Sequence, residues 1–401
     1  MKHLLIIGHT FPEPNTTAAG SRMMQLMQLF MEDGFDITFA TTASKTPYTP
    51  TLYEFAIKVK NILLNDTSFD GFISQLQPSV VLFDRYITEE QFGWRVSEQC
   101  PNALKILDTE DLHFLRKARE VAFKKGLEVN LFSDTTKREL ASILRCDISL
   151  IISKAEMKLL IETFKIPESL LYYLPFLVTT VSQDTISFED RQHFISIGNF
   201  QHAPNTDAVI FLKKEIWPKI KEQLPAAELH IYGAYAPKQI SELHSENEGF
   251  LLKGWAEDVA EIMLQSRVNL APLRFGAGLK GKLLDAAQFG TPSVSTSFGV
   301  EGMEGIAICE DEVDAFIASS IKLYSDISAW EAQQRQAFSV VEREFSKSKF
   351  ATSFMNDVSQ LQHTITKHRE THFIGQVLQH QSAQATKYMS KWIEEKNKKL
   401  S

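Results

Sequence analysis

The chain has 401 residues, of which 44% are hydrophobic and 23% are charged, and it contains three cysteines that lie far apart in sequence. This length and composition exclude a disordered chain and a small disulfide-stapled scaffold, and they predict two or three globular domains. The formal charge of −8 at pH 7 provides no overall positive field for nucleic acid, so we expect any anion to bind at a local site.

The sequence predicts neither a secretory signal nor a membrane-spanning helix. The first apolar run, at residues 4–7, is too short for a signal peptide and is predicted to be a strand. Nowhere do about 18 uncharged apolar residues follow one another. Few and scattered cysteines are typical of a reducing compartment, so we expect a cytoplasmic protein.

The first half of the chain alternates short apolar runs with helical patterns. Predicted strands cover residues 4–7, 37–40, 80–83, 104–107 and 148–152, and a helix is predicted over residues 21–31. This alternation is typical of a parallel sheet wound with helices, and it predicts a Rossmann-like domain over residues 1–185. Polar residues follow each strand, and in open α/β sheets ligands lie outside the carboxyl ends of strands.

A second wound domain is predicted after a polar stretch around residues 179–190, which we interpret as an interdomain linker. Its strands are expected at residues 194–198, 228–232, 249–253, 268–271 and 293–295, with helices at 206–216, 257–265 and 282–289. From Asp311 onward only helical patterns occur. We therefore predict a domain over residues 186–345, followed by helices over residues 346–401 that cross back to, or pack on, the first domain.

The densest chemical signal lies at residues 271–292, where a strand is followed by a glycine-containing loop and then by a helix. Gly276 and Gly278 let backbone N–H groups approach an anion, and the N-terminus of the helix adds a partial positive charge. The full positive charges of the segment are Arg274, Lys280 and Lys282. Because neither a Walker spacing nor a GxGxxG fingerprint is present, we predict a phosphate cradle of another kind, with a flexible surface turn as the alternative.

This segment resembles the donor-binding motif of glycosyltransferases of the GT-B fold, in particular those of group 1 (family 4). Three further segments resemble that family in the same order: residues 194–200, 225–233 and 250–259. The resemblance implies two Rossmann-like domains that face a cleft and a nucleotide-diphosphate sugar as the donor. It also implies that no further cofactor or metal is needed, and it favours transfer with retention of configuration.

The resemblance assigns the donor site residue by residue, with two departures. Asp285 takes the place of an acidic residue that binds the ribose hydroxyls; the alternative is an aspartate favoured by the helix dipole. The family's sugar-facing glutamate is replaced by Ala277. The cation expected near Gly198 is also missing, which leaves His202 or Asn205 as stand-ins and Asn199 as a further nucleotide-sugar contact.

Glu301 lies in a loop that resembles one bordering the donor cleft. We predict that it contacts a sugar hydroxyl or takes over part of the role that Ala277 cannot fill; a solvated loop glutamate is the alternative. The long loop at residues 9–22 resembles the family's N-terminal glycine-containing loop, which approaches the donor phosphate and the acceptor. There Gly20 and Ser21 are predicted to open a helix. Arg22 in its first turn is predicted to contact an anion or to form a surface salt bridge.

Residues 106–116 follow a predicted strand and resemble the stretch of the family that carries a histidine near the transferred sugar. We predict that His113 bonds the sugar or the acceptor and that Asp111 or Glu110 orients it or acts as the base. A helix N-cap built from residues 108–110 is the alternative. The S-x-x-E spacing of Ser153 and Glu156 predicts a capping box without a catalytic role.

The sequence thus predicts a glycosyltransferase that acts on a saccharide, lipid-linked saccharide or protein acceptor, in bacterial polysaccharide or glycoconjugate biosynthesis. The rival hypotheses are a nucleotide-sugar epimerase and a noncatalytic nucleotide-sugar-binding protein. Histidine, cysteine and acidic residues show no zinc spacing, so no metal site is predicted. The tail over residues 382–401 holds five lysines and two glutamates. It is predicted to be a docked helix, or alternatively an amphipathic helix on a partner or on the inner membrane face.

Overall fold

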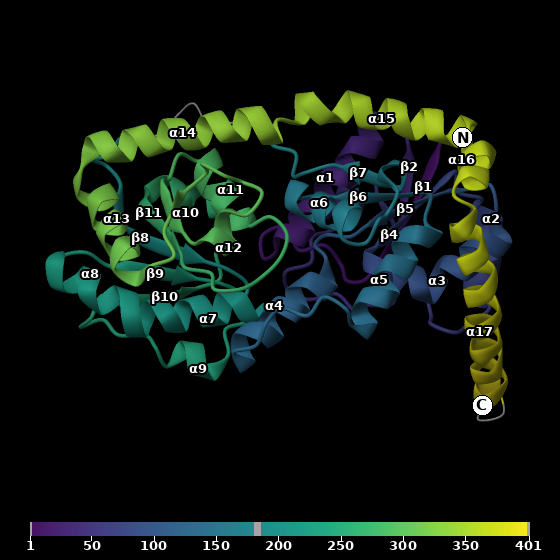
Figure 1. Cartoon of the computed structure of the whole chain (residues 1–401), viewed down its shortest axis with the longest axis horizontal. Coiled ribbons are helices and arrows are strands. Elements are labelled where there is room, and N and C mark those ends of the chain that lie inside the picture. Colours follow the sequence, from purple (N-terminus) through teal and green to yellow (C-terminus); the bar gives the residue numbers. More distant parts are fainter. Residues whose placement is uncertain (1, 180–185, 399–401) are drawn as a thin grey trace.

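The computed structural model describes residues 2–179 and 186–398, which form two parallel sheets surrounded by helices (Figure 1). The proposed boundary between residues 185 and 186, and most of the predicted linker, fall outside the described residues or at their edge. Among the described residues, no helix is long and apolar enough to cross a membrane.

The first sheet has seven strands in the order β3-β2-β1-β4-β5-β6-β7. The strands are β1 (His3–Gly8), β2 (Asp36–Thr41), β3 (Lys58–Asn61), β4 (Val80–Asp84), β5 (Leu104–Asp108), β6 (Ile148–Ile151) and β7 (Leu171–Tyr173). The helices are α1 (Ala18–Glu32), α2 (Ser68–Leu76), α3 (Arg85–Gln99), α4 (His113–Lys125), α5 (Asp134–Arg145) and α6 (Lys154–Glu162). All five predicted strands are confirmed, whereas β3 and β7 were not predicted.

The second sheet has six strands in the order β10-β9-β8-β11-β12-β13. The strands are β8 (Gln192–Ile197), β9 (Leu229–Tyr232), β10 (Phe250–Gly254), β11 (Ser266–Ala271), β12 (Ser293–Ser295) and β13 (Ile308–Cys309). The helices are α7 (Ala203–Phe211), α8 (Trp217–Gln223), α9 (Lys238–Ser241), α10 (Val259–Gln265), α11 (Gly281–Gln288), α12 (Ser297–Val300) and α13 (Val313–Ser325). The five predicted strands are again confirmed, and only the two-residue strand β13 was missed.

Apolar runs form these strands because both faces of each sheet are buried. In β1, Leu4 and Ile6 point into one hydrophobic core while Leu5 and Ile7 point into the other. A strand that is covered on both sides is uniformly apolar instead of alternating. All strand pairs in both sheets are parallel, so each domain presents its carboxyl strand ends along one edge.

The last helices connect the two domains (Figure 1). They are α14 (Ile327–Phe345), α15 (Lys347–His363), α16 (Ile365–Thr371) and α17 (Phe373–Lys398). Helix α14 buries Trp330 in the core of the second domain, and α15 buries Phe354 and Val358 in the core of the first. Helix α17 then runs along α3 and α5 at the far side of the first domain.

Candidate active site between the domains

A cavity of about 290 Å³ lies between the two domains, and residues that follow the carboxyl ends of strands in both sheets line it. Twelve of the predicted site residues line this cavity: Ser21, Glu110, Asp111, His113, Asn199, His202, Asn205, Gly276, Gly278, Lys280, Lys282 and Asp285. Four do not line it: Gly20, Arg22, Arg274 and Glu301. The fold therefore brings most of the predicted donor and transfer residues to one place.

The loop between β11 and α11 lies against the first domain. Gly278 has φ = 65°, and a Cβ atom at this position would lie 2.7 Å from the Cβ of Asp111. Only glycine combines this backbone conformation with so close an approach. The glycine-containing loop therefore places the N-terminus of α11 beside the residues that follow β5.

Two partly buried lysines of this segment face the cavity. The Lys280 ammonium donates to the carbonyl oxygens of Ala277 (2.9 Å) and Gly278 (2.5 Å), and the Lys282 ammonium donates to Oδ1 of Asn205 (2.7 Å). Burial lowers the pKa of Lys280 to about 8 and that of Lys282 to about 7. An anionic ligand would favour the charged form of both lysines, most of all that of Lys282, because an opposite charge nearby stabilises an ammonium ion.

Asp285 lies three residues after Lys282 on α11, so both side chains belong to the same face of the helix. Burial raises the pKa of Asp285 to about 7. Asn199, at the turn after β8, also lines the cavity, and its Oδ1 accepts from the backbone N–H of Gln201 (2.8 Å). Its Nδ2 is buried and has no hydrogen-bond partner among the described residues. These groups offer hydrogen-bonding capacity for ribose or sugar hydroxyls.

The first domain contributes a cluster of ionisable side chains after β5. Oδ1 of Asp111 lies 3.5 Å from Nε2 of His113, and Oδ2 of Asp111 lies 3.3 Å from Nε of Arg116. Burial lowers the pKa of His113 to about 3, so its imidazole is neutral at pH 7. Burial raises the pKa of Asp111, but the cationic neighbours, Arg116 foremost, outweigh this effect and bring it below its usual value. The site thus presents a neutral histidine beside a charged carboxylate.

The helix cap predicted from residues 108–110 is wrong, because a distant residue supplies it. Helix α4 begins at His113, and its first backbone N–H groups are bonded by the buried carboxylate of Glu139. Glu139 accepts from the N–H of His113 (3.1 Å) and of Phe114 (2.9 Å). The side chain of His113 is therefore not needed for capping, and it remains in the cavity wall with its ring edge-on to Tyr86.

Arg22 is buried inside the first domain, which contradicts its predicted roles as an anion contact and as a surface salt bridge. Its side chain is 1% exposed, and its Nε donates to both carboxylate oxygens of Asp108 (2.9 and 3.1 Å). Its Nη1 also donates to the carbonyl oxygen of Leu174 (2.8 Å). The Asp108 carboxylate, which also lies 2.9 Å from Nη2, explains how a cation is tolerated there, although Nη2 itself makes no hydrogen bond among the described residues.

Gly20 and Ser21 lie in the first turns of α1 but do not open it, because the helix begins at Ala18 with Thr17 as its N-cap. A Cβ atom on Gly20 would lie 2.4 Å from the backbone of Glu13, so this glycine lets the preceding loop fold back onto the helix. Ser21 Oγ donates to the carbonyl oxygen of Pro14 (2.8 Å). Of the three predicted loop residues, only Ser21 lines the cavity.

Arg274 and Glu301 have ion-pair partners outside the cavity. The guanidinium of Arg274 donates to both carboxylate oxygens of Asp207 (2.9 and 2.6 Å) and lies over the ring of Phe123. Glu301 accepts two hydrogen bonds of 2.7 Å from Arg119 of the first domain. The geometry corrects the predicted phosphate contact of Arg274 and the predicted sugar contact of Glu301, since both groups join the two domains instead.

Further contacts join the second domain to the loop before α1, part of which lines the cavity. The Tyr235 hydroxyl of the second domain donates to the carboxylate of Glu13 (3.0 Å to each oxygen), and Trp255 Nε1 donates to the carbonyl oxygen of Asn15 (3.2 Å). The ring of Tyr48 packs against both Tyr235 and Trp255. The two domains are therefore held together by contacts from more than one loop near the site.

Glu156 is a site residue that the sequence analysis assigned to a capping box. The side chain of Ser153 makes no capping bond, and Glu156 lies buried between the domains. Its Oε1 accepts from the backbone N–H of Leu112 in the first domain (3.2 Å) and of Gly278 in the second (2.9 Å). Burial raises its pKa to about 7. One carboxylate thus fixes the donor loop to the loop after β5.

Arg85 is a second residue that was not assigned. It follows β4, lines the cavity, and has the unusual value φ = 69° for a residue with a side chain. Its Nε lies 3.5 Å from the carboxylate of Asp84. The sequence signal that could have identified it is the pair Asp84–Arg85, which directly follows the predicted strand at residues 80–83. This arginine adds a positive charge to the first-domain wall of the cavity.

Comparisons with known proteins support the interpretation of the second domain. Residues 191–326 match the family model of the group 1 glycosyl transferases. A search of curated protein sequences gave no match.

Solved structures resemble nearly the whole chain. A mutant of TarM from S. aureus, in complex with fondaparinux, α-GlcNAc-glycerol and UDP, has 10% identity and a TM-score of 0.68, covering 89% of this chain and 99% of its own. HepE from Anabaena, in complex with UDP and glucose, has 10% identity and a TM-score of 0.66, with 89% and 99% coverage. Sucrose-phosphate synthase from Thermosynechococcus elongatus has 14% identity and a TM-score of 0.67, with 90% and 99% coverage. At these identities the similarity shows the GT-B fold, as predicted.

Proposed function

Since the chain has the GT-B fold and its second domain matches the group 1 glycosyl transferases, we propose that it transfers a glycosyl unit from a nucleotide-diphosphate sugar to an acceptor hydroxyl. One observation carries this proposal. The phosphate-binding elements of the second domain and the Asp111–His113 cluster of the first line the same cavity. Both a donor and an acceptor can therefore reach one reaction centre.

The second domain supplies leaving-group stabilisation in this proposal. The diphosphate lies against the N-terminus of α11, beside Lys280 and Lys282, and the ribose hydroxyls face Asp285. When the anomeric C–O bond breaks, negative charge grows on the departing phosphate. Positive groups that are already in position stabilise that charge more than they stabilise the ground state, and this difference lowers the barrier. We propose that this stabilisation needs no bound metal, in line with the expectation from the sequence.

The first domain supplies the groups around the transferred sugar. The neutral His113 can accept a hydrogen bond from a sugar or acceptor hydroxyl, or donate one to it, and the Asp111 carboxylate fixes its orientation. Ala277 offers no carboxylate at the position of the family glutamate. We propose that transfer retains the anomeric configuration, and this proposal rests on the family match alone. NMR of the product, which reports its anomeric configuration, tests it.

The contacts around the cavity limit the access of water to the donor. Arg119 binds Glu301, and Glu13 binds Tyr235. Exclusion of water protects an activated sugar from hydrolysis and strengthens the electrostatic interactions within the site. A donor must therefore enter while these interdomain contacts are open, and transfer follows when they close.

A ligand screen followed by a turnover assay tests the proposed function. Nucleotide sugars are screened by thermal shift, beginning with UDP-sugars because two of the similar structures contain UDP. We expect one donor to raise the melting midpoint and release of its nucleotide to require an acceptor. Conversion of the donor to its epimer without an acceptor would instead establish an epimerase. Tight binding without turnover across an acceptor panel would establish a binding protein.

The C-terminal helix supports a further part of the proposal, namely peripheral contact with the inner face of a membrane in a cytoplasmic protein of glycoconjugate assembly. Tyr388, Met389 and Trp392 of α17 are each more than half exposed, and lysines lie among them. Cosedimentation with vesicles tests this contact. We expect binding to anionic vesicles that is lost in a Trp392→Ala variant, whereas equal binding by both proteins would contradict it.

A further inference from the structure

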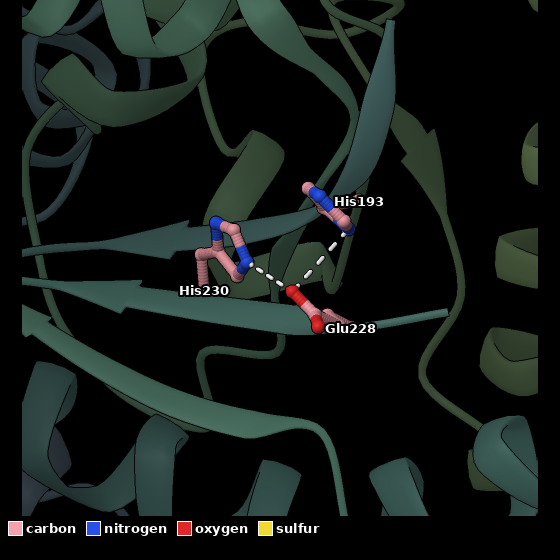
Figure 2. Close-up of side chains that lie close together, drawn as sticks. All are labelled: His193, Glu228 and His230. Carbon is pink, nitrogen blue, oxygen red and sulfur yellow. Dashed lines mark hydrogen bonds and ion pairs between the residues drawn. The ribbon is translucent and has the colours of Figure 1, made fainter. Parts of the chain in front are cut away.

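Two histidines and a glutamate lie together far from the cavity, at the amino ends of β8 and β9 (Figure 2). His193 is the second residue of β8, Glu228 precedes β9, and His230 is its second residue. The cavity lies beyond the other end of β8, about 13 Å further along at roughly 3.3 Å per residue. This cluster is therefore separate from the proposed transfer site.

The parallel pairing of β8 with β9 explains why these residues meet. Ile195 pairs with His230, and Phe194 pairs with Leu229. Because successive side chains in a strand alternate between faces, residues 228 and 230 point to the same side of the sheet. His193 has φ = 60°, outside the strand region, and its ring stacks on that of His230 with the centroids 4.4 Å apart, which places it on the same side. Sequence spacing could not reveal the cluster, since His193 comes from a different strand from the other two.

The distances between the three side chains are those of groups that share one ion. Oε2 of Glu228 lies 2.8 Å from Nε2 of His230 and 3.7 Å from Nδ1 of His193. All three ligand atoms lie within 4.8 Å of one another. A tetrahedral ion with ligand bonds of about 2.0 to 2.2 Å separates its ligand atoms by about 3.3 to 3.5 Å. The two measured distances lie on either side of that value, and the 2.8 Å hydrogen bond between Glu228 and His230 would have to lengthen for both to bind one ion.

One atom of the cluster lacks a partner. Nδ1 of His193 is buried and has no hydrogen-bond partner among the described residues, and at 3.7 Å from Glu228 it is beyond hydrogen-bond distance. A buried polar atom that is left unpaired lowers stability. The atom faces the same carboxylate oxygen as His230, as Figure 2 shows. A cation held between the three side chains would satisfy it.

We propose that His193, Glu228 and His230 bind a divalent transition-metal ion, with Zn²⁺ as the ion that suits them best. Two imidazoles and one carboxylate favour zinc and its neighbours over magnesium or calcium, which prefer oxygen ligands alone. The three side chains are 32%, 38% and 17% exposed, respectively, so water can occupy the fourth position of a tetrahedron. This assignment is independent of the proposed glycosyl transfer.

The ion would act on the stability of the second domain and not on the reaction. It would join β8 to β9 at the end of the sheet that follows the interdomain segment. Burial is the main cause that lowers the pKa of both histidines, and the nearby positive charge of Lys253 adds to this effect. The same charge opposes a bound cation. We therefore expect an affinity below that of closed four-ligand zinc sites, and Lys253→Met should increase it.

Metal titration of the full chain tests the assignment. The chelator-treated protein is titrated with Co²⁺, whose visible absorption reports tetrahedral coordination, and with Zn²⁺ in calorimetry. We expect one equivalent of tight binding and a melting midpoint raised by about 5 °C or more when Zn²⁺ is at a hundredfold excess over Kd. His193→Ala and His230→Ala should each weaken binding by at least about tenfold. Glu228→Gln retains the side-chain size and should do the same.

Two control variants make the result decisive. His380→Ala removes an exposed histidine on α17, and His372→Ala removes one ring of the His368–His372 pair, whose ring centroids lie 4.6 Å apart at the junction of α16 and α17. Both should bind as the unmodified chain does. The assignment is overturned if the cluster variants bind Co²⁺ as tightly as the unmodified chain, or if His372→Ala is the variant that loses binding. It is also overturned if Lys253→Met does not tighten binding, because that substitution leaves all three ligands in place.

Discussion

Burial sets the protonation state of the residues that face the cavity. Lys282 has a pKa of about 7, so about half of its side chains are uncharged at neutral pH. A bound diphosphate favours the ammonium form, and binding must therefore take up a proton. We expect the affinity for a nucleoside diphosphate to fall as the pH rises from 7 to 9. Calorimetry in buffers of different ionisation enthalpy measures the proton uptake directly.

The Lys282→Ala variant separates the phosphate contact from other effects. A charge-assisted hydrogen bond contributes about 1.5 to 3 kcal/mol, so the variant should lose about tenfold or more in affinity for the nucleoside diphosphate. Affinity for the nucleoside alone should hardly change and serves as the control. An equal loss for both ligands would locate the phosphate elsewhere.

His113 tests whether the two domains form one active site. We expect His113→Ala to reduce turnover about a hundredfold or more, in the range of a positioned acid, base or transition-state donor. Nucleotide affinity should stay the same. The melting midpoint should fall by only a few degrees, because Glu139 caps α4 through the backbone N–H of residue 113, which alanine retains. A destabilised protein with full activity would remove His113 from the site.

Sequence patterns revealed the local surroundings of site residues but not their distant partners. Lys280, Lys282 and Asp285 were found because the motif itself sets the loop and helix that carry them. Arg274 and Glu301 were misassigned because their partners lie 67 and 182 residues away in the chain. Glu156 was misassigned for the same reason, since S-x-x-E spacing describes a local cap and cannot reveal a contact between domains.

At the scale of elements, the loop between β11 and α11 depends on a support from the other domain. Oε1 of Glu156 accepts both backbone hydrogen bonds, while its Oε2 is buried without a partner among the described residues. The carbonyl oxygen of glutamine can replace Oε1, whereas alanine cannot. We expect Glu156→Ala to lower donor affinity and turnover, and Glu156→Gln to preserve both. Donor affinity measured on the pair separates loss of the support from loss of the charge.

The raised pKa of Glu156 predicts that the stability of the protein depends on pH. The pKa of Glu156 is about 7 in the folded protein and 4.5 in its usual range, so the folded state holds a proton that the unfolded state has released. Stability from this group is therefore lost as pH rises from about 4.5 through 7. One pKa unit corresponds to about 1.4 kcal/mol. The free energy of unfolding of Glu156→Gln, compared with that of the unmodified chain, should therefore be higher at pH 8 than at pH 4 by up to about 3 kcal/mol. Melting midpoints at both pH values measure this, and parallel curves would contradict it.

Strands were predictable where burial on both faces makes them continuously apolar, as in β1, β4 and β8. Strand β3 was missed because all four of its residues are exposed at the edge of the sheet, and its sequence Lys-Val-Lys-Asn carries no apolar run. Strands β7 and β13 are too short to show a pattern. Edge strands and short strands form because they pair with an adjacent strand. A local sequence pattern contains no information about that pairing.

At the scale of the whole molecule, α17 is held on the first domain by a buried arginine. Arg95 is 2% exposed and donates to Asp70 (2.5 Å), to Glu394 of α17 (2.6 Å) and to Ser390 of α17 (2.9 Å). We expect Glu394→Gln to release α17 locally, with faster hydrogen exchange over residues 373–398 and little change in the second domain. Lys391→Gln, at an exposed position of the same helix, is the control. Unchanged exchange in the Glu394 variant would show that packing on α3 and α5 suffices.

The crossing from α14 to α15 has a consequence for the order in which the chain folds. The core of the first domain includes Phe354, Met355 and Val358, which are synthesised only after the whole second domain. Domains fold as units during synthesis, usually beginning with the N-terminal one. Here the second domain has its full core before the first does. The first sheet must wait, with one face incompletely covered, until about 180 further residues beyond its last strand have left the ribosome. The domain that begins synthesis is the last to be completed.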